Sequence, residues 1–175
     1  MNIIKICFIG IILTLSATAA SEIDPLKNIN ERTHVLNQTL DLQLASPIAR
    51  FYKRVTPDFI EISITNFTSN IEDLSIAINN ILQGKPTDGI SDITRFTINS
   101  TLGIGGFIDV ASGLGLDKND EDFGQTLAVW GIPDGPYLVL PGLGPSTMRD
   151  TLAMIPDAFL TPLWLLDHDR TAYSL

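Results

Sequence analysis

One acidic segment has the composition of a calcium-binding loop without its geometry. The residues DKNDEDFG (117–124) place Asp117, Asn119 and Glu121 at alternate positions, as an EF-hand places its ligands. An EF-hand loop also needs a glycine at its sixth position, where this chain has Asp122. We therefore expect a solvated acidic segment here, and no bound metal.

Two other groups of residues raise the possibility of catalysis. The segment GPSTM (144–148) lacks the second glycine of a nucleophile elbow and places proline before Ser146, so we expect Ser146 to begin a helix. Residues 167–169, Asp-His-Asp, are adjacent and would point in different directions on a helix. The two histidines, His34 and His168, have no HExxH motif or cysteine partner that would indicate zinc. The sequence therefore predicts no catalytic, metal or cofactor site, and we do not expect an enzyme.

Three glycines in RFTINSTLGIGGFID (95–109) indicate a sharp turn. Gly103, Gly105 and Gly106 can take positive φ without a Cβ penalty. A dinucleotide-binding G-x-G-x-x-G motif would need a third glycine where this chain has Ile108. We expect the three glycines to form a structural turn between two buried elements, with positive φ in at least one of them.

A second segment rich in glycine and proline follows at 132–145. These residues surround the apolar run YLVL, which favours an extended, hairpin-like loop over a helix. Directly after it, Thr147 and Asp150 have the spacing of a capping box, which predicts the start of a last helix.

The order and spacing of these blocks resemble the MlaA (VacJ) family of outer-membrane phospholipid-asymmetry proteins. No single motif among them is as specific as the whole series. The resemblance covers about 24–150 and is carried by DPL (24–26), NILQGKP (80–86), the glycine turn (95–109), DFGQTLAVWG (122–131) and GPYLVLPGLGPSTMRD (135–150).

The resemblance implies non-catalytic phospholipid transport that maintains outer-membrane lipid asymmetry. Family members resemble helical rings in the inner leaflet of the outer membrane, bound to trimeric porins, which pass phospholipid from the outer leaflet through an amphipathic channel to a soluble periplasmic carrier. The alternative is a degenerate periplasmic structural or interaction protein that has lost transport. By resemblance, the gate-loop candidates are Gly135, Tyr137, Pro141, Gly142 and Gly144.

The N-terminus has the features of a secretory signal peptide. Lys5 precedes an apolar run over 6–15, and small residues with A-x-A spacing end at Ala19. We therefore expect residues 1–19 to be a signal peptide and 20–175 an exported MlaA-like domain, short at its C-terminus relative to the family. Because Cys7 lies within the signal and the cleavage region contains no lipobox cysteine, we expect no acyl anchor.

The charge balance excludes nucleic acid as a partner. The chain has 11 Lys and Arg against 20 Asp and Glu, a net charge of -9. An acidic chain has no electrostatic footprint for nucleic acid, and its membrane contact must be mainly apolar. Hydrophobic residues make up 45% of the sequence, in agreement with such a contact.

Hydrophobic periodicity predicts a mainly α, single-domain fold of short amphipathic helices, ring-like by resemblance. We expect a first helix over 24–44 and a break at Ser46-Pro47, with Ser46 as the N-cap of a second helix that ends at Thr56-Pro57. The buried stripe predicted for the first helix consists of Ile29, Thr33, Leu36, Leu40 and Leu44.

The later helices are predicted by spacing and by punctuation. The segment after Pro57 fits helix or strand because β-branched residues are frequent there, and we expect a helix. A stripe over 71–82 predicts a helix that ends at Gly84, and another helix runs from about Thr87 to the glycine turn. The acidic residues 120–122 would begin a further helix favourably, because negative charge is stabilising at a helix N-terminus.

Overall fold

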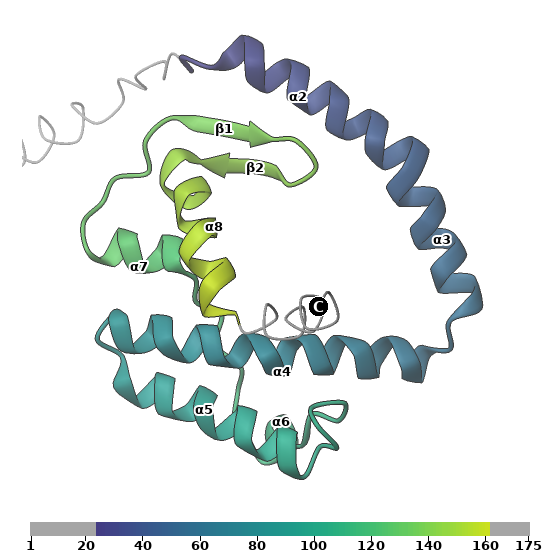
Figure 1. Cartoon of the computed structure of the whole chain (residues 1–175), viewed down its shortest axis with the longest axis vertical. Coiled ribbons are helices and arrows are strands. Elements are labelled where there is room, and N and C mark those ends of the chain that lie inside the picture. Colours follow the sequence, from purple (N-terminus) through teal and green to yellow (C-terminus); the bar gives the residue numbers. More distant parts are fainter. Residues whose placement is uncertain (1–23, 162–175) are drawn as a thin grey trace, which may run out of the picture.

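Helices dominate the computed structural model, which describes residues 24–161 (Figure 1). This confirms the predicted mainly α fold. The elements in chain order are α2 (Lys27–Leu40), the π-helical turn η1 (Asp41–Ala45), α3 (Ser46–Val55), α4 (Asp58–Leu82), α5 (Pro86–Thr101), α6 (Val110–Gly113), α7 (Phe123–Val129), β1 (Tyr137–Leu140), β2 (Gly144–Thr147) and α8 (Met148–Leu160).

The elements are arranged as a ring. In Figure 1, α2 and α3 form one curved arm, α4 crosses the base, and α8 with the β1–β2 hairpin forms the opposite side. Helix α5 packs against α4 on the side away from the middle of the ring. Between residues 24 and 161, no helix combines the length and the apolar character needed to cross a membrane.

The curved arm corrects two of the sequence predictions. The expected break at Ser46-Pro47 is wrong, because η1 joins α2 to α3 and the backbone stays in the right-handed helical region at Ala45 and Ser46. Pro47 lies in the first turn of α3, directly after η1, and the N–H that proline lacks is one that a first helical turn leaves without an intrahelical partner. The expected buried stripe is also wrong, since the exposed fraction is 58% for Ile29 and 56% for Leu44.

The expected ends of α3 and α4 agree with the structure. Helix α3 ends before the extended residues Thr56 and Pro57, and the segment after Pro57 is helical, as predicted. It continues without interruption to Leu82, so α4 has 25 residues. Gly84 follows with a φ of 79°, and α5 begins at Pro86.

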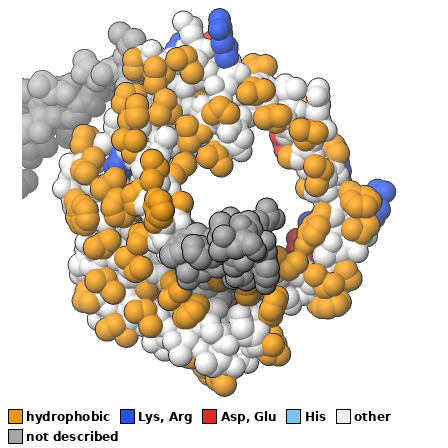
Figure 2. All heavy atoms as spheres, in the orientation of Figure 1, with side chains coloured by type: hydrophobic (Ala, Val, Ile, Leu, Met, Phe, Trp, Pro, Cys, Tyr) orange, Lys and Arg blue, Asp and Glu red, His pale blue; other side chains and the backbone are white. Residues whose placement is uncertain are grey.

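The distribution of polar and apolar side chains is inverted relative to a water-soluble protein. Asp73, Asn79, Asp92 and Arg95 on α4 and α5 are buried, whereas large apolar side chains such as Phe59 are exposed. Figure 2 shows apolar side chains spread over the visible surface of the described elements. Because exposed apolar area of this extent marks a contact surface, the helices are built to meet lipid or another protein.

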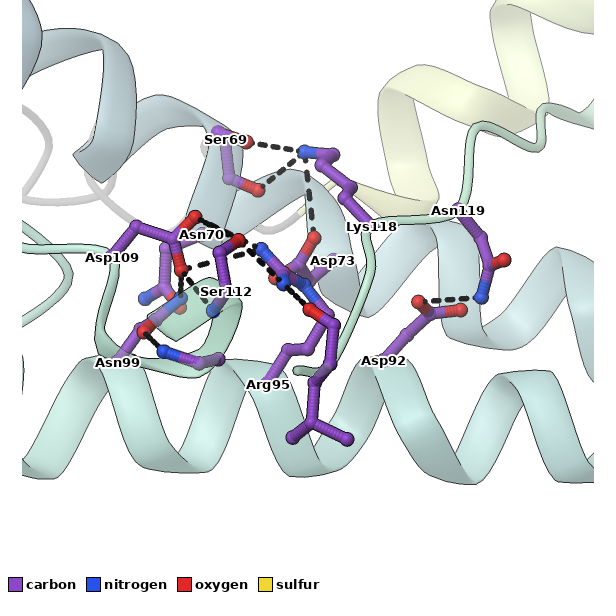
Figure 3. A network of polar contacts seen from close by, with 12 residues as sticks. Ser69, Asn70, Asp73, Asp92, Arg95, Asn99, Asp109, Ser112, Lys118 and Asn119 are labelled. Atoms are coloured by element: carbon purple, nitrogen blue, oxygen red, sulfur yellow. Dashed lines mark hydrogen bonds and ion pairs between the residues drawn. The ribbon is translucent and has the colours of Figure 1, made fainter. Parts of the chain in front are cut away.

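A buried ion cluster holds α4, α5 and the chain beyond α5 together (Figure 3). The Nε atom of Arg95 lies 3.5 Å from Oδ2 of Asp73, and its Nη2 atom lies 3.4 Å from Oδ2 of Asp109. Arg95 also donates to Ser112 Oγ and to the Leu116 carbonyl. Arg95 and Asp73 are almost completely buried, so each charge depends on its partners for compensation.

Further polar contacts surround this cluster. Lys118 extends from the acidic segment to the Ser69 carbonyl at 2.9 Å and to Asp73 Oδ1 at 3.4 Å. Burial raises the pKa of Asp73, although Lys118 and Arg95 act to lower it. About one turn before Arg95 on α5, Asp92 accepts hydrogen bonds from Asn80 at 2.8 Å and Asn119 at 2.9 Å. The acidic segment is therefore attached to the α4–α5 pair and is not simply solvated.

The glycine turn follows directly after α5. Gly105 and Gly106 have φ values of 71° and 96°. At Gly103, a Cβ atom would lie 2.1 Å from the Ile108 carbonyl oxygen and 2.5 Å from the Asn99 carbonyl oxygen. Thus two of the glycines permit the backbone conformation, and the third permits a close approach of the chain to itself.

We expect G103A to destabilise the fold more than G105A. The Cβ at position 103 meets backbone atoms that cannot rotate away, so G103A should lower the free energy of unfolding by about 3 kcal/mol. No atom lies within 4 Å of a Cβ at position 105, and only its left-handed conformation should cost about 1 kcal/mol. Denaturation followed by circular dichroism measures both, and equal losses would contradict this account.

The ion cluster predicts a pH-dependent contribution from Asp109. Burial acts to raise its pKa, but hydrogen bonds from Ser112 and Asn99 and the charge of Arg95 lower it from 3.8 to about 2. A lowered native pKa adds stability above the unfolded pKa, and this stability is lost as the pH falls. We expect D109N to lower the free energy of unfolding by about 1 to 2 kcal/mol near neutral pH and by less than about 0.5 kcal/mol near pH 2. Denaturation across this range, with E31Q as an exposed carboxylate control, tests the effect, and a pH-independent difference would argue against it.

Candidate functional site

The central opening of the ring is the candidate functional site. Figure 2 shows it as a hollow between the curved arm and the hairpin side of the ring, and Figure 1 places α4 across the base of the ring. Two grooves lie where the arm meets the hairpin. One, of about 690 Å³, lies between α2 and β1, and its lining includes His34, Val35 and Tyr137. The other, of about 460 Å³, lies between η1 and the tip of the hairpin.

The wall of the second groove is amphipathic. Asn37 and Asp41 contribute polar groups, while Leu44 and Ile48 contribute apolar ones. Opposite them lie Gly142–Gly144 at the hairpin tip. Such a wall suits a ligand that has both a polar and an apolar part, since neither part would be left without a matching surface.

The hairpin that forms the opposite wall has a defined register. Tyr137 pairs with Thr147 and Leu140 with Gly144, so Pro141–Leu143 form the connecting loop. This agrees with the hairpin-like loop predicted from the run YLVL. The Val139 residue lies opposite Pro145, which has no N–H to donate, and Val139 is buried. Along an antiparallel strand, alternate residues direct their N–H away from the partner strand, and the Val139 N–H has its partner outside the sheet.

Two asparagines of α2 supply the partners for the hairpin backbone. Asn30 Oδ1 accepts from the Val139 N–H at 2.9 Å, and Asn30 Nδ2 donates to the Tyr137 carbonyl at 3.0 Å. One heptad later, Asn37 Oδ1 accepts from the Gly142 N–H at 2.8 Å, and its Nδ2 donates to the Leu140 carbonyl at 2.9 Å. The two side chains therefore fix the hairpin to the curved arm.

Sequence reasoning missed Asn30 and Asn37. A usable signal was present, because a spacing of seven residues places both amides on one face of a helix. Asn30 is also buried, and its Nδ2 donates to Asp24 Oδ2 at 3.0 Å. Asp24, the first residue of the DPL block, therefore helps to orient the Asn30 side chain.

The predicted gate-loop residues lie on this hairpin or directly before it. Tyr137 is in β1 and Gly144 in β2, while Pro141 and Gly142 are in the loop between the strands. Gly135, Gly142 and Gly144 have φ values of 71°, 77° and 93°. Their assignment to a gate remains a prediction.

Of the candidate groups for catalysis, only Ser146 lies among the described residues 24–161. Ser146 lies in β2, and its Oγ accepts from Thr151 Oγ1 at 3.1 Å. The expectation that Ser146 begins the last helix is wrong, because Thr147 is the N-cap of α8 and accepts from the Asp150 N–H. Residues 167–169, with His168, lie outside the described residues, as does the predicted signal peptide. Within 24–161, no group of three or more His, Cys, Asp and Glu residues is placed to hold a metal ion.

Two carboxylates on the hairpin side of the ring, the half-buried Asp157 and the exposed Asp122, are structural. Asp157 on α8 accepts from the Phe123 N–H at 3.0 Å and from Asn79 Nδ2 at 3.4 Å, and its burial raises its pKa. Asp122 is the N-cap of α7, and its Oδ1 accepts from the Gln125 N–H at 2.6 Å. A negative charge therefore lies at the start of this helix, as predicted. These contacts attach α7 and α8 to α4 and so hold the hairpin side in position.

Comparisons with known proteins agree on one family. A model of the MlaA lipoprotein family matches residues 22–175. The intermembrane phospholipid transport system lipoprotein MlaA of Escherichia coli K12 is 37% identical over 148 residues, which cover 81% of this chain and 59% of that protein. An uncharacterized protein of Rickettsia conorii is 40% identical over 147 residues, covering 83% of this chain and 59% of the relative.

A solved structure has the same fold. It comes from a study of the structural basis for maintenance of bacterial outer membrane lipid asymmetry, and it superposes with a TM-score of 0.67 at 31% sequence identity. The likeness covers 87% of this chain and 89% of the solved chain. By contrast, this chain spans only about 59% of the length of the curated relatives.

We expect N30A to release the hairpin from the curved arm. The buried Val139 N–H would lose its Asn30 acceptor, which should cost about 1 to 3 kcal/mol. Amide hydrogen exchange at Val139 should then accelerate by about tenfold or more. The matched control is N28A on the exposed face of the same helix, and unchanged exchange at Val139 in N30A would show that the amide contacts do not hold the hairpin.

Proposed function

Because the chain belongs to the MlaA lipoprotein family, we propose that it transports phospholipid and maintains outer-membrane lipid asymmetry without catalysis. Phospholipid misplaced in the outer leaflet would enter the central opening, pass along its amphipathic wall and leave toward the periplasm. No bond is made or broken in this process, so it needs neither a nucleophile nor a cofactor.

The observation that carries this proposal is the amphipathic groove inside a ring with an apolar exterior. A phospholipid that leaves a membrane must keep its headgroup in polar surroundings and its acyl chains in apolar ones. Asn37 and Asp41 would accompany the headgroup, and Leu44 and Ile48 the acyl chains. Exposed apolar side chains of α4, such as Phe59 and Ile62, would hold the ring among the lipids of one leaflet.

The finer parts of the proposal concern location and partners. We place the protein on the periplasmic side of the outer membrane, after export, beside a trimeric porin and upstream of a soluble periplasmic lipid carrier. The family resemblance supports this placement. The exposed apolar side chains of the ring would contact the inner leaflet and the porin. The central opening of the ring would face the carrier.

The hairpin is the proposed gate of the opening. It carries Gly135, Tyr137, Pro141, Gly142 and Gly144, and its tip faces the groove wall. Because Asn30 and Asn37 fix its backbone to the arm, movement of the gate would involve exchange of these hydrogen bonds, and would not depend on glycine flexibility alone.

Obstruction of the groove tests the proposed function. Expression in a bacterium that lacks its own family member should restore detergent resistance, and A45W should abolish this effect because Ala45 lines the groove. We expect A49W, one turn further along α3 and outside the groove lining, to restore resistance as the unmodified chain does. The variant S146A should remain within a few-fold of the unmodified chain.

The outcomes separate the proposal from its alternatives. Co-purified phospholipid in solvent extracts supports transport, whereas a chain that restores nothing and carries no lipid would be the structural or interaction protein of the alternative reading. Release of free fatty acid that S146A abolishes would indicate a hydrolase and would overturn the proposal.

A further inference from the structure

Helix α3 concentrates positive charge in an otherwise acidic chain. The net charge of the whole chain is -9, yet the sequence of α3, SPIARFYKRV, contains three basic residues and no acidic one. Arg50, Lys53 and Arg54 are all exposed. Within residues 24–161, none of the ion pairs involves these three side chains. Their charge is therefore available to a partner outside the described chain.

The two faces of α3 are separated. At 100° per residue, its apolar side chains occupy one side of the helix, and Arg50, Lys53 and Arg54 occupy the opposite side. The apolar face consists of Ile48, Phe51, Tyr52 and Val55, with exposed fractions of 64%, 67%, 40% and 57%. A helix with one basic face and one uncovered apolar face is typical of segments that lie in a membrane interface.

The surroundings of α3 agree with contact to a lipid surface. Its apolar face continues into exposed side chains on both neighbours, including Leu44 of η1 and Phe59 of α4. Figure 2 shows Lys or Arg side chains projecting from the outer edge of the molecule over α3, away from the opening. The charges therefore face outward from the ring, where lipid headgroups could be reached by long side chains.

We propose that α3 is a binding site for anionic phospholipid headgroups, whose phosphates its three outward-facing cations contact, while its apolar face lies on the opposite side, toward the opening, where Ile48 lines the groove. It is the part of the acidic chain that a negatively charged surface attracts, so it would orient the ring and set its depth. This inference rests on the proposed function only in requiring a phospholipid bilayer. It adds a preference for anionic lipid that transport itself does not demand.

Vesicle flotation of the full chain tests this site. The probes are vesicles of phosphatidylcholine alone and vesicles of equal amounts of phosphatidylcholine and phosphatidylglycerol. We expect stronger binding to the anionic vesicles, and R50Q/R54Q should weaken that binding by about ten- to thirtyfold while leaving binding to neutral vesicles unchanged. Raised salt should remove the same preference.

Matched variants show whether position or total charge matters. The variant K27Q/R32Q removes the same charge from the exposed surface of α2 and should keep the preference, and R50K/R54K should keep it as well. Equal losses in R50Q/R54Q and K27Q/R32Q would attribute binding to net charge and overturn the assignment to α3. Circular dichroism of each variant establishes that the fold is retained.

Other outcomes identify other partners. Absence of any preference for anionic vesicles overturns the proposal, and so does a self-association of the chain that R50Q/R54Q abolishes, because α3 would then bind a second copy. A chain that restores lipid asymmetry without preferring anionic vesicles would leave the transport function standing and remove this inference alone. A chain that prefers anionic vesicles without restoring lipid asymmetry would support the α3 site and remove the transport function.

Discussion

The burial of Arg95 between Asp73 and Asp109 is the constraint on which the rest of the fold depends. A guanidinium without water is tolerated only when carboxylates and hydrogen-bond acceptors compensate it, and these come from α4, the glycine turn and the residues around α6. The charges therefore fix the positions of segments that apolar packing does not hold, since few apolar side chains of residues 24–161 are buried. With its buried charges paired inside, the α4–α5 pair can present its apolar side chains outward.

This inversion connects the fold to the opening. Helix α4 is braced from one side by the ion cluster and from the other by the contacts of Asp157 with Phe123 and Asn79, so it forms a rigid base for the ring. Among residues 24–161, the curved arm has no such bracing along its length, and it meets the hairpin through Asn30 and Asn37. The part of the ring that encloses the groove is thus held by a small number of hydrogen bonds, which is compatible with the movement proposed for the gate.

Much of the fold could be predicted from the sequence because its signals are local. Proline at Pro57 and Pro86 and glycine at Gly84 mark helix limits through backbone geometry alone, and Asp122 and Thr147 cap the helices that follow them. The hairpin was predictable for the same reason, since glycine and proline surround a short apolar run. The exposure of the apolar stripe on α2 and η1 could not be predicted. The spacing of Ile29, Leu36 and Leu44 indicates an apolar face, but it does not show whether other parts of the protein cover that face.

The sequence by itself determined a mainly helical, acidic chain with two glycine-rich turns and a series of blocks that identifies its family. Only the tertiary structure decided which residues enclose the opening and which way the helices face. The contacts responsible join residues far apart in the chain, such as Asn30 with Val139 and Lys118 with Ser69. Local spacing carries no information on such pairs, because the same asparagine on a helix can face water, lipid or another backbone. Its contribution to the free energy of folding depends on what the folded chain places against it.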